Sequence, residues 1–272
     1  MTGYQNLHTH TTYCDGVLPP EGMIKAALAK GCASVGFSEH SNVRSVEKRY
    51  SMSRKTTLDY IREIDALKDK YRDDIEVFLG LEQDYYTDRQ AKGFDYIIGA
   101  LHYIGREERL APVDADERNQ KQMVNELFGG DYYALAEDYY SVLAGLVKKT
   151  NADIIGHFDL ITKYNFNGCL FDETHPRYVS AALDAMEEIL KNCRLFEVNT
   201  GAMFRIGKPE PYPSAFLLRQ LCKRGGEVIL TSDSHDAESL CYNFDSIRGL
   251  LKACGFKYCK RLTKAGFADE KL

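Results

Sequence analysis

Nine side chains of the types that bind metal ions recur along this chain, most of them at the ends of apolar runs. Histidine, aspartate and glutamate supply the nitrogen and oxygen ligands of divalent ions in proteins. The set comprises His8, His10, Asp15, His40, Glu82, His102, His157, Asp233 and His235. Side chains so far apart in sequence meet only where successive strands end together, as in a closed β/α barrel. The sequence therefore predicts a barrel with a metal centre at the carboxyl ends of its strands.

The placement of the histidines is more informative than any one of them. His8 and His10 lie two residues apart on an expected strand, so their side chains share one face and could bind one ion. Six of the seven histidines lie at or just past strand ends, and the seventh, His175, precedes a proline at an expected helix start and is interpreted as structural. For Glu82 and Asp233, which follow strongly apolar runs, the alternative is a structural salt bridge.

The chemistry that such a set serves is hydrolysis assisted by clustered cations. Nine ligands exceed the needs of one ion and fit two or three. Imidazole-rich ligation favours zinc, manganese or iron over magnesium. Paired ions about 3.5–4 Å apart lower the pKa of bound water to about 7 and neutralise phosphate oxygens. The sequence therefore predicts phosphate-ester hydrolysis by a metal-bridging hydroxide, and it identifies no side chain as the general acid.

Two cations follow the later expected strands and could bind the phosphate oxygens that the metals leave free. Lys163 comes shortly after His157, and Arg205 comes shortly after the strand that ends at Asn199. Both could reach the same face of a barrel as the metal ligands. The alternative for each is an ordinary surface cation.

The chain alternates between apolar, strand-like runs and helical patterns. Strands are expected over 4–8, 34–40, 76–82, 95–102, 152–159, 195–200 and 228–235, and helices over 19–30, 57–72, 131–149, 176–192, 213–225 and 245–254. Near-continuous apolar runs are typical of parallel strands covered by helices on both faces. The pattern predicts an α/β fold, a TIM-like barrel of seven strands or a distorted one of eight, formed by residues 1–272 as a single domain.

Two segments between these elements could shape the catalytic face. The stretch from Gly105 to Gly130 is polar, is expected to be irregular, and could be a lid or an idle surface loop. A basic stretch after the second strand could form a positive rim that attracts an anionic substrate, or simply a solvated face. Its members are Arg44, Lys48, Arg49, Arg54 and Lys55.

Composition excludes several other classes of protein. Hydrophobic residues make up 44% and charged residues 28%, as in ordinary globular proteins. No apolar run is long enough to cross a membrane and no secretory signal is visible, so a cytoplasmic location is expected. A net charge of −5 argues against a nucleic-acid partner and leaves a small molecule as the expected substrate. The eight cysteines are expected to be reduced packing thiols, including Cys14 beside Asp15.

Six motifs in order resemble those of the polymerase and histidinol phosphatase (PHP) superfamily: NLHTHTTYCDG, FSEH, GLE, ALH, GHFDL and SDSH. The stretch NTGAMFRIGKPEPYPS resembles its histidinol-phosphate phosphatase branch. This resemblance implies a distorted seven-stranded barrel with a trinuclear metal site. It also implies that the enzyme hydrolyses L-histidinol phosphate to L-histidinol and phosphate in histidine biosynthesis.

The same resemblance implies how the ligands are shared among three ions. One ion would be held by His8, His10, Glu82 and Asp233, a second by Glu82, His102 and His157, and a third by Asp15, His40 and His235. The chain departs from the family pattern beside Lys163, where Thr162 stands in place of an expected arginine.

Three alternatives stay open at this point. A phosphoesterase of the same superfamily could act on another small phosphomonoester or a nucleotide. A metal-dependent amidohydrolase also begins with His-x-His on a barrel strand, but usually bridges its ions with a lysine, where this chain offers Glu82. A catalytically silent metal-binding protein would need neither the complete ligand set nor the two phosphate-facing cations.

Overall fold

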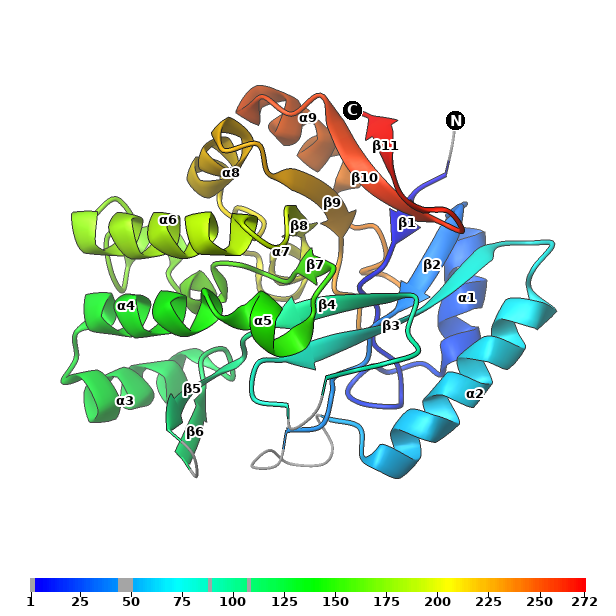
Figure 1. Cartoon of the computed structure of the whole chain (residues 1–272), viewed down its shortest axis with the longest axis horizontal. Coiled ribbons are helices and arrows are strands. Elements are labelled where there is room, and N and C mark those ends of the chain that lie inside the picture. The colour runs from blue at the N-terminus through cyan, green and yellow to red at the C-terminus, as the bar shows by residue number, and fades with distance from the viewer. Residues whose placement is uncertain (1–2, 44–50, 88–89, 107–108) are drawn as a thin grey trace.

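The centre of the computed structural model, which describes residues 3–43, 51–87, 90–106 and 109–272, is a curled sheet of parallel strands (Figure 1). Seven strands in order form it: β1 Gln5–Asn6, β2 Ser34–Phe37, β3 Glu76–Asp84, β4 Tyr96–Ala100, β7 Ile154–Ile155, β8 Leu195–Asn199 and β9 Glu227–Thr231. Every neighbouring pair among them is parallel. The prediction of a distorted seven-stranded α/β barrel is therefore confirmed.

The barrel closes differently at its two ends. At the carboxyl ends of the strands, the Thr9–Ser234 bridge joins the chain after β1 to the chain after β9. At the other end, the Gln5 side chain bonds the backbone nitrogen and oxygen of Leu262, at 2.7 and 2.9 Å. Leu262 belongs to β10 (Tyr258–Thr263), which pairs with β9 and with the antiparallel β11 (Gly266–Lys271). The extra hairpin thus fills the gap between β9 and the start of β1.

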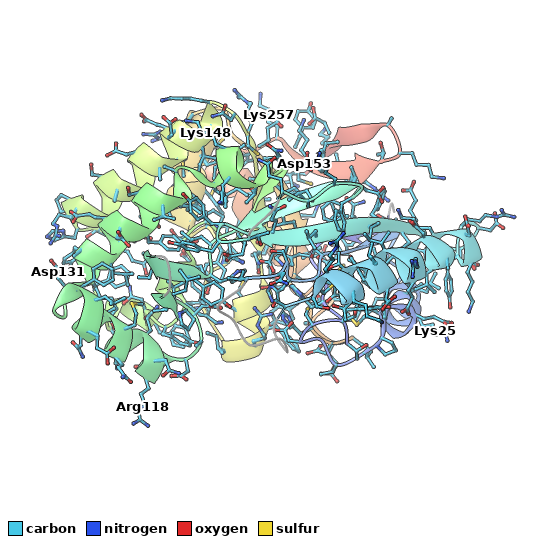
Figure 2. All side chains as sticks on the ribbon, turned by 60° about the horizontal axis from the view of Figure 1, so that its bottom comes forward. Lys25, Arg118, Asp131, Lys148, Asp153 and Lys257 are labelled. Carbon is cyan, nitrogen blue, oxygen red and sulfur yellow. The ribbon has the colours of Figure 1, made fainter. Side chains whose placement is uncertain are left out.

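Helices cover the outside of this barrel (Figure 1). Their bounds are α1 Pro20–Ala29, α2 Arg54–Lys70, α4 Tyr132–Leu143, α5 Leu146–Thr150, α6 Pro176–Leu190, α7 Gly201–Ile206, α8 Ala215–Lys223 and α9 Phe244–Cys254. Apolar residues face the sheet, and charged residues such as Lys25 of α1 project outward (Figure 2). Among the described residues, no helix has both the length and the apolar character required to span a bilayer.

Two expectations about secondary structure were wrong. The helix expected over 131–149 is two helices, because the chain tightens into a turn at Gly145, whose N–H bonds the Val142 carbonyl three residues back. The stretch 105–130, expected to be irregular, contains most of a hairpin, β5 (Tyr103–Arg106) with β6 (Arg109–Pro112), and the helix α3 (Glu117–Phe128). Asp116 caps the start of α3 and Gly129 ends it in a left-handed conformation, a pattern that can be read from sequence.

The basic stretch after β2 lies partly outside the described residues. Arg44, Lys48 and Arg49 belong to the segment that the structure does not describe. Arg54 and Lys55 are exposed on the first turn of α2, where Lys55 pairs with Asp59 at 2.7 Å. The positive rim stays a prediction.

Tyr96 fills the inside of the barrel. Its ring is fully buried among apolar residues of the strands, and the single proton of its hydroxyl lies within hydrogen-bonding reach of the carbonyls of both Leu7 and Phe37. Glycines on β2 and β3 make room for it: a Cβ at Gly36 would lie 2.4 Å from the Tyr96 hydroxyl, and one at Gly80 2.2 Å from the ring. The tyrosine therefore ties β1, β2 and β4 together across the barrel.

Gly80→Ala is expected to destabilise the fold by about 1–3 kcal/mol, because the added methyl group collides with a ring that has no room to move. The matched control is Gly249→Ala on α9, where a Cβ meets nothing within 4 Å and a helix-favouring residue should be neutral or stabilising. Urea unfolding of the two variants measures the difference. Equal stabilities would contradict this packing.

Candidate metal centre

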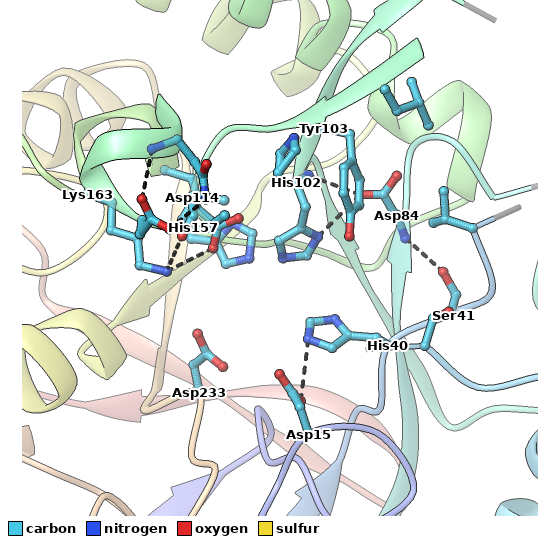
Figure 3. Close-up of a pocket in the computed structure, with 18 of the residues that line it drawn as sticks. Asp15, His40, Ser41, Asp84, His102, Tyr103, Asp114, His157, Lys163 and Asp233 are labelled. Carbon is cyan, nitrogen blue, oxygen red and sulfur yellow. Dashed lines mark hydrogen bonds and ion pairs between the residues drawn. The ribbon is translucent and has the colours of Figure 1, made fainter. Parts of the chain in front are cut away.

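The structure brings all nine predicted side chains to the carboxyl ends of the barrel strands. Each of five strands is followed by at least one of them, and Glu82 lies within β3. Six of the nine line a cavity of about 650 Å³: Asp15, His40, His102, His157, Asp233 and His235. The labelled members point into one common space in Figure 3. His8, His10 and Glu82 are more deeply buried beneath it.

The Glu82 carboxylate lies at the middle of the set. Its Oε2 is 3.5 Å from His8 Nε2, 3.6 Å from His10 Nε2 and 2.7 Å from His40 Nδ1. Its Oε1 is 3.3 Å from His102 Nε2 and 2.9 Å from His157 Nε2. A carboxylate with one oxygen toward each of two groups of imidazoles has the arrangement needed to bridge two cations.

Two further carboxylates complete the cluster. Asp233 Oδ1 lies 3.3 Å from His10 Nε2 and 3.7 Å from His8 Nε2. Asp15 Oδ1 lies 3.2 Å from His235 Nε2 and 3.7 Å from His40 Nε2. Asp233 also has a φ of 43°, a left-handed conformation that is uncommon outside glycine and that aspartate tolerates better than most residues. Among the nine side chains, ligand-type atoms therefore lie close enough together for three overlapping groups that could each hold an ion, and a fourth such group joins His10 to Cys14 and Glu39.

Unpartnered nitrogen atoms test whether this site fits a metal. His8 Nε2 and His10 Nε2 are buried and have no hydrogen-bond partner among the described residues. Both face the carboxylates of Glu82 and Asp233. Buried polar atoms are normally paired, since an unpaired one costs free energy. A divalent cation would satisfy nitrogen and oxygen together, so the residues present fit a metal.

Two carboxylates that the sequence interpretation missed hold the imidazoles from behind. Glu197 Oε2 lies 2.8 Å from His8 Nδ1, and its Oε1 accepts a hydrogen bond from the His157 backbone N–H at 2.6 Å. Asp84 Oδ2 lies 3.2 Å from His102 Nδ1 and accepts from the His102 backbone N–H. A carboxylate at Nδ1 fixes the tautomer and leaves Nε2 free for a metal. Glu197 could have been found as the one acid inside the apolar run LFEVN.

The carboxylates control the charge of the imidazoles. Burial alone would lower the pKa of His8, but Glu197, Asp233 and Glu82 outweigh it and raise the pKa well above its ordinary value. Burial is likewise outweighed at His40, whose pKa rises to about 10 next to Glu82 and Asp15. At His10 burial and the neighbouring imidazoles lower the pKa to about 3. Without metal, protons on some of the imidazoles therefore balance the negative charge of the carboxylates. A bound cation would take over that role.

The two predicted phosphate-binding cations both line the cavity. Arg205 donates to Asp233 Oδ2 at 2.8 Å and to the Asp233 carbonyl at 2.7 Å. Lys163 donates to the carboxylate and the carbonyl of Asp114, each at 2.9 Å. Burial opposes the charge on Asp114, but Lys163 and His102 lower its pKa to about 2. Two cations from separate elements thus flank the ligand cluster in one cavity.

Three other residues singled out by sequence lie beside or outside the cluster. Cys14 donates to Glu39 at 2.6 Å, and burial together with that carboxylate raises the pKa of the thiol well above its usual value, which disfavours a reactive thiolate. His175 caps the start of α6 by accepting a hydrogen bond from the Arg177 N–H, and it does not line the cavity. Thr162 is buried and donates to the Asp159 carbonyl at 2.8 Å. The eight cysteines form no disulfide.

A family comparison agrees with this arrangement. The sequence model of the PHP domain matches residues 6–201, which carry seven of the nine clustered side chains. The chain belongs to the PHP domain family. Two curated PHP relatives match along most of their length. A probable histidinol-phosphatase of Deinococcus radiodurans is 29% identical, covering 94% of this chain and 95% of the relative. The histidinol-phosphatase of Bacillus subtilis is 25% identical, covering 88% and 96%.

A solved structure shares the PHP fold. The histidinol phosphate phosphatase of Lactococcus lactis, crystallised with zinc, L-histidinol and phosphate, superposes with a TM-score of 0.73. The likeness covers 97% of this chain and 98% of that one at 20% identity. This chain and that phosphatase therefore share the same distorted barrel fold.

Metal uptake by this PHP domain is expected to release protons. The pKa of His40 is raised to about 10, so this imidazole is expected to hold a proton at pH 7.5 in the metal-free protein, and the pKa of His8 is raised in the same direction; only neutral imidazole binds a metal. The apparent zinc affinity should therefore fall as the pH is lowered. Titration calorimetry with zinc in two buffers of different ionisation enthalpy counts the protons. Identical binding enthalpies in the two buffers would mean that none is released and would contradict this charge state.

Proposed function

We propose that this protein is a metal-dependent phosphomonoesterase that hydrolyses L-histidinol phosphate to L-histidinol and phosphate, a step of histidine biosynthesis. The observation that carries the proposal is that one cavity is lined by six of the nine clustered side chains, with the other three buried beneath it, and by two cations. The relatives match nearly the whole chain, and their names indicate the substrate that we propose. The bound histidinol and phosphate of the Lactococcus lactis phosphatase agree with it.

The proposed ligands divide into three sets, and the first two of them share Glu82. The first set is His8, His10, Glu82 and Asp233, the second is Glu82, His102 and His157, and the third is Asp15, His40 and His235. Close approaches among His8, His10 and Asp233, among Asp15, His40 and His235, and of His102 and His157 to Glu82 support the division, although His40 also lies close to Glu82. Their imidazole content favours zinc, manganese or iron, and zinc is the metal of the solved relative. When bound, such ions acidify water and neutralise phosphate oxygens.

The remaining roles belong to the side chains around the ligands. Glu197 and Asp84 hold the imidazoles of His8 and His102 with Nε2 toward the cluster. Lys163 and Arg205 are proposed to bind phosphate oxygens that point away from the metals. Both cations line the same cavity as six of the proposed ligands, which supports a phosphate subsite there.

The rivals lose support from the same geometry. An amidohydrolase would need a bridging lysine, but the position between the imidazoles holds Glu82. A silent metal-binding protein needs no cations around a cavity, and this chain has two. The single domain over residues 1–272, the cytoplasmic location and the absence of a nucleic-acid partner stay predictions.

Phosphate release from histidinol phosphate is expected to exceed release from nucleoside monophosphates by at least about 100-fold in kcat/KM. A selective active site reaches such ratios when its polar groups match one substrate. A colorimetric phosphate assay with zinc-loaded and manganese-loaded protein measures the ratio. Faster turnover of a nucleotide would instead support the alternative phosphoesterase.

Asp233→Ala and His157→Ala are expected to abolish turnover while leaving folded protein with less bound metal. Each removes a ligand and leaves the strands that carry it in place. His175→Gln is the matched control, because this histidine caps α6 outside the cavity, and it should keep both activity and metal. Elemental analysis measures the metal content of each variant, circular dichroism shows whether it is folded, and the phosphate assay measures its turnover. Unaltered activity in either ligand variant would refute the assigned role.

A further inference from the structure

The described part of the segment 103–128, which is all of it except residues 107 and 108, lies between β4 and α4 and is fixed to the barrel by buried hydrogen bonds. Gln120 of α3 is fully buried, and its side-chain amide donates to the Val113 carbonyl at 2.8 Å and to the Ile161 carbonyl at 3.1 Å. The Val113 N–H in turn donates to the His102 carbonyl at 2.8 Å. One side chain thus joins the segment to the turn after β7. The two carbonyls that it bridges lie one residue before Asp114 and two residues before Lys163.

The bridge sets Asp114 against Lys163. The Lys163 ammonium donates to both the carboxylate and the carbonyl of Asp114, and the Tyr164 hydroxyl donates to the same carbonyl at 2.8 Å. The Lys163 side chain is only 13% exposed. An ammonium has three donors, so two contacts with Asp114 fix its position without using all of its donors. Figure 3 shows the pair at the edge of the space that the imidazoles face.

We propose that Asp114 is a positioning residue of the phosphate subsite, which holds the Lys163 ammonium toward the cavity so that it meets a phosphate oxygen. The proposal rests on the proposed function and adds a role for the segment 103–128. Rather than opening and closing as a lid, this segment completes the anion site from the outside of the barrel.

The physical reason lies in the flexibility of lysine. A four-carbon stem has many rotamers, and an ordered phosphate contact must overcome their entropy. Asp114 and the Gln120 bridge select the Lys163 rotamer before the substrate binds, so that less side-chain entropy is lost on binding. The negative charge of Asp114 itself opposes a bound anion. Positioning and charge therefore predict opposite effects when the carboxylate is removed, which makes the role testable.

The experiment measures binding of inorganic phosphate to the zinc-loaded protein by titration calorimetry in a double-mutant cycle. The variants are Asp114→Asn, Lys163→Met and their combination, with Glu117→Gln as the control. Glu117 lies on α3 of the same segment and pairs with the exposed Lys121, so this control removes a carboxylate without touching the cavity. Asp114→Glu tests rescue, because it restores the charge at a slightly different reach.

Asp114→Asn is expected to weaken phosphate binding about tenfold, with zinc content and Tm close to those of the parent protein. In the Lys163→Met background the same change should have no weakening effect, and Glu117→Gln should bind as the parent does. Partial recovery in Asp114→Glu would further support a positioning role. Tighter or unchanged binding in Asp114→Asn, or equal weakening in both backgrounds, would overturn the proposal.

Turnover of histidinol phosphate is measured in parallel, because it distinguishes a failure of the proposed function from a failure of the positioning role of Asp114. If the parent protein binds phosphate but releases none from histidinol phosphate, the proposed substrate is wrong while the cycle still tests Asp114. If turnover is present and the cycle shows no coupling, the proposed function stands and the positioning role fails.

Discussion

The Glu82 carboxylate, surrounded by five imidazoles, is the constraint on which the rest of the site depends. A buried carboxylate is costly unless cations or hydrogen-bond donors surround it, and here those partners come from four other strand ends. Without metal, the imidazoles must take up protons to balance the acids, which explains the raised pKa values of His8 and His40. With metal, one carboxylate could serve two ions. The fold therefore has to bring the ends of four other strands within a few ångströms of one side chain.

The barrel meets this demand through contacts outside the cluster itself. The Thr9–Ser234 bridge closes the sheet beside His8, His10 and Asp233, so these three side chains are held by backbone pairing between the first and last barrel strands. Glu197 then links His8 to the His157 backbone across the barrel. On the outer side, Gln120 fixes the segment 103–128 and places Asp114 beside Lys163. Rigid support of this kind keeps ligands and cations in place before any substrate arrives.

Sequence alone predicted the barrel and the cluster because both depend on local patterns. Apolar runs that end in His40, Glu82 or His102 indicate parallel strands and the place where they deliver ligands. The missed features depend on tertiary contacts. Asp84 looks like one more acid at the end of a strand until its hydrogen bonds to His102 are known. The polar sequence of α3 gives little sign of the buried Gln120, and the pairing of Asp114 with Lys163 joins residues 49 positions apart.

The most direct test of the proposed metal-dependent phosphatase activity is a stepwise zinc titration of chelator-treated protein, with release of phosphate from histidinol phosphate measured at each step. The structure predicts no turnover in the metal-free protein and a rise that ends at two or three bound ions per chain. Turnover that persists in protein shown by elemental analysis to be free of metal would contradict the central claim, however well the nine side chains are arranged.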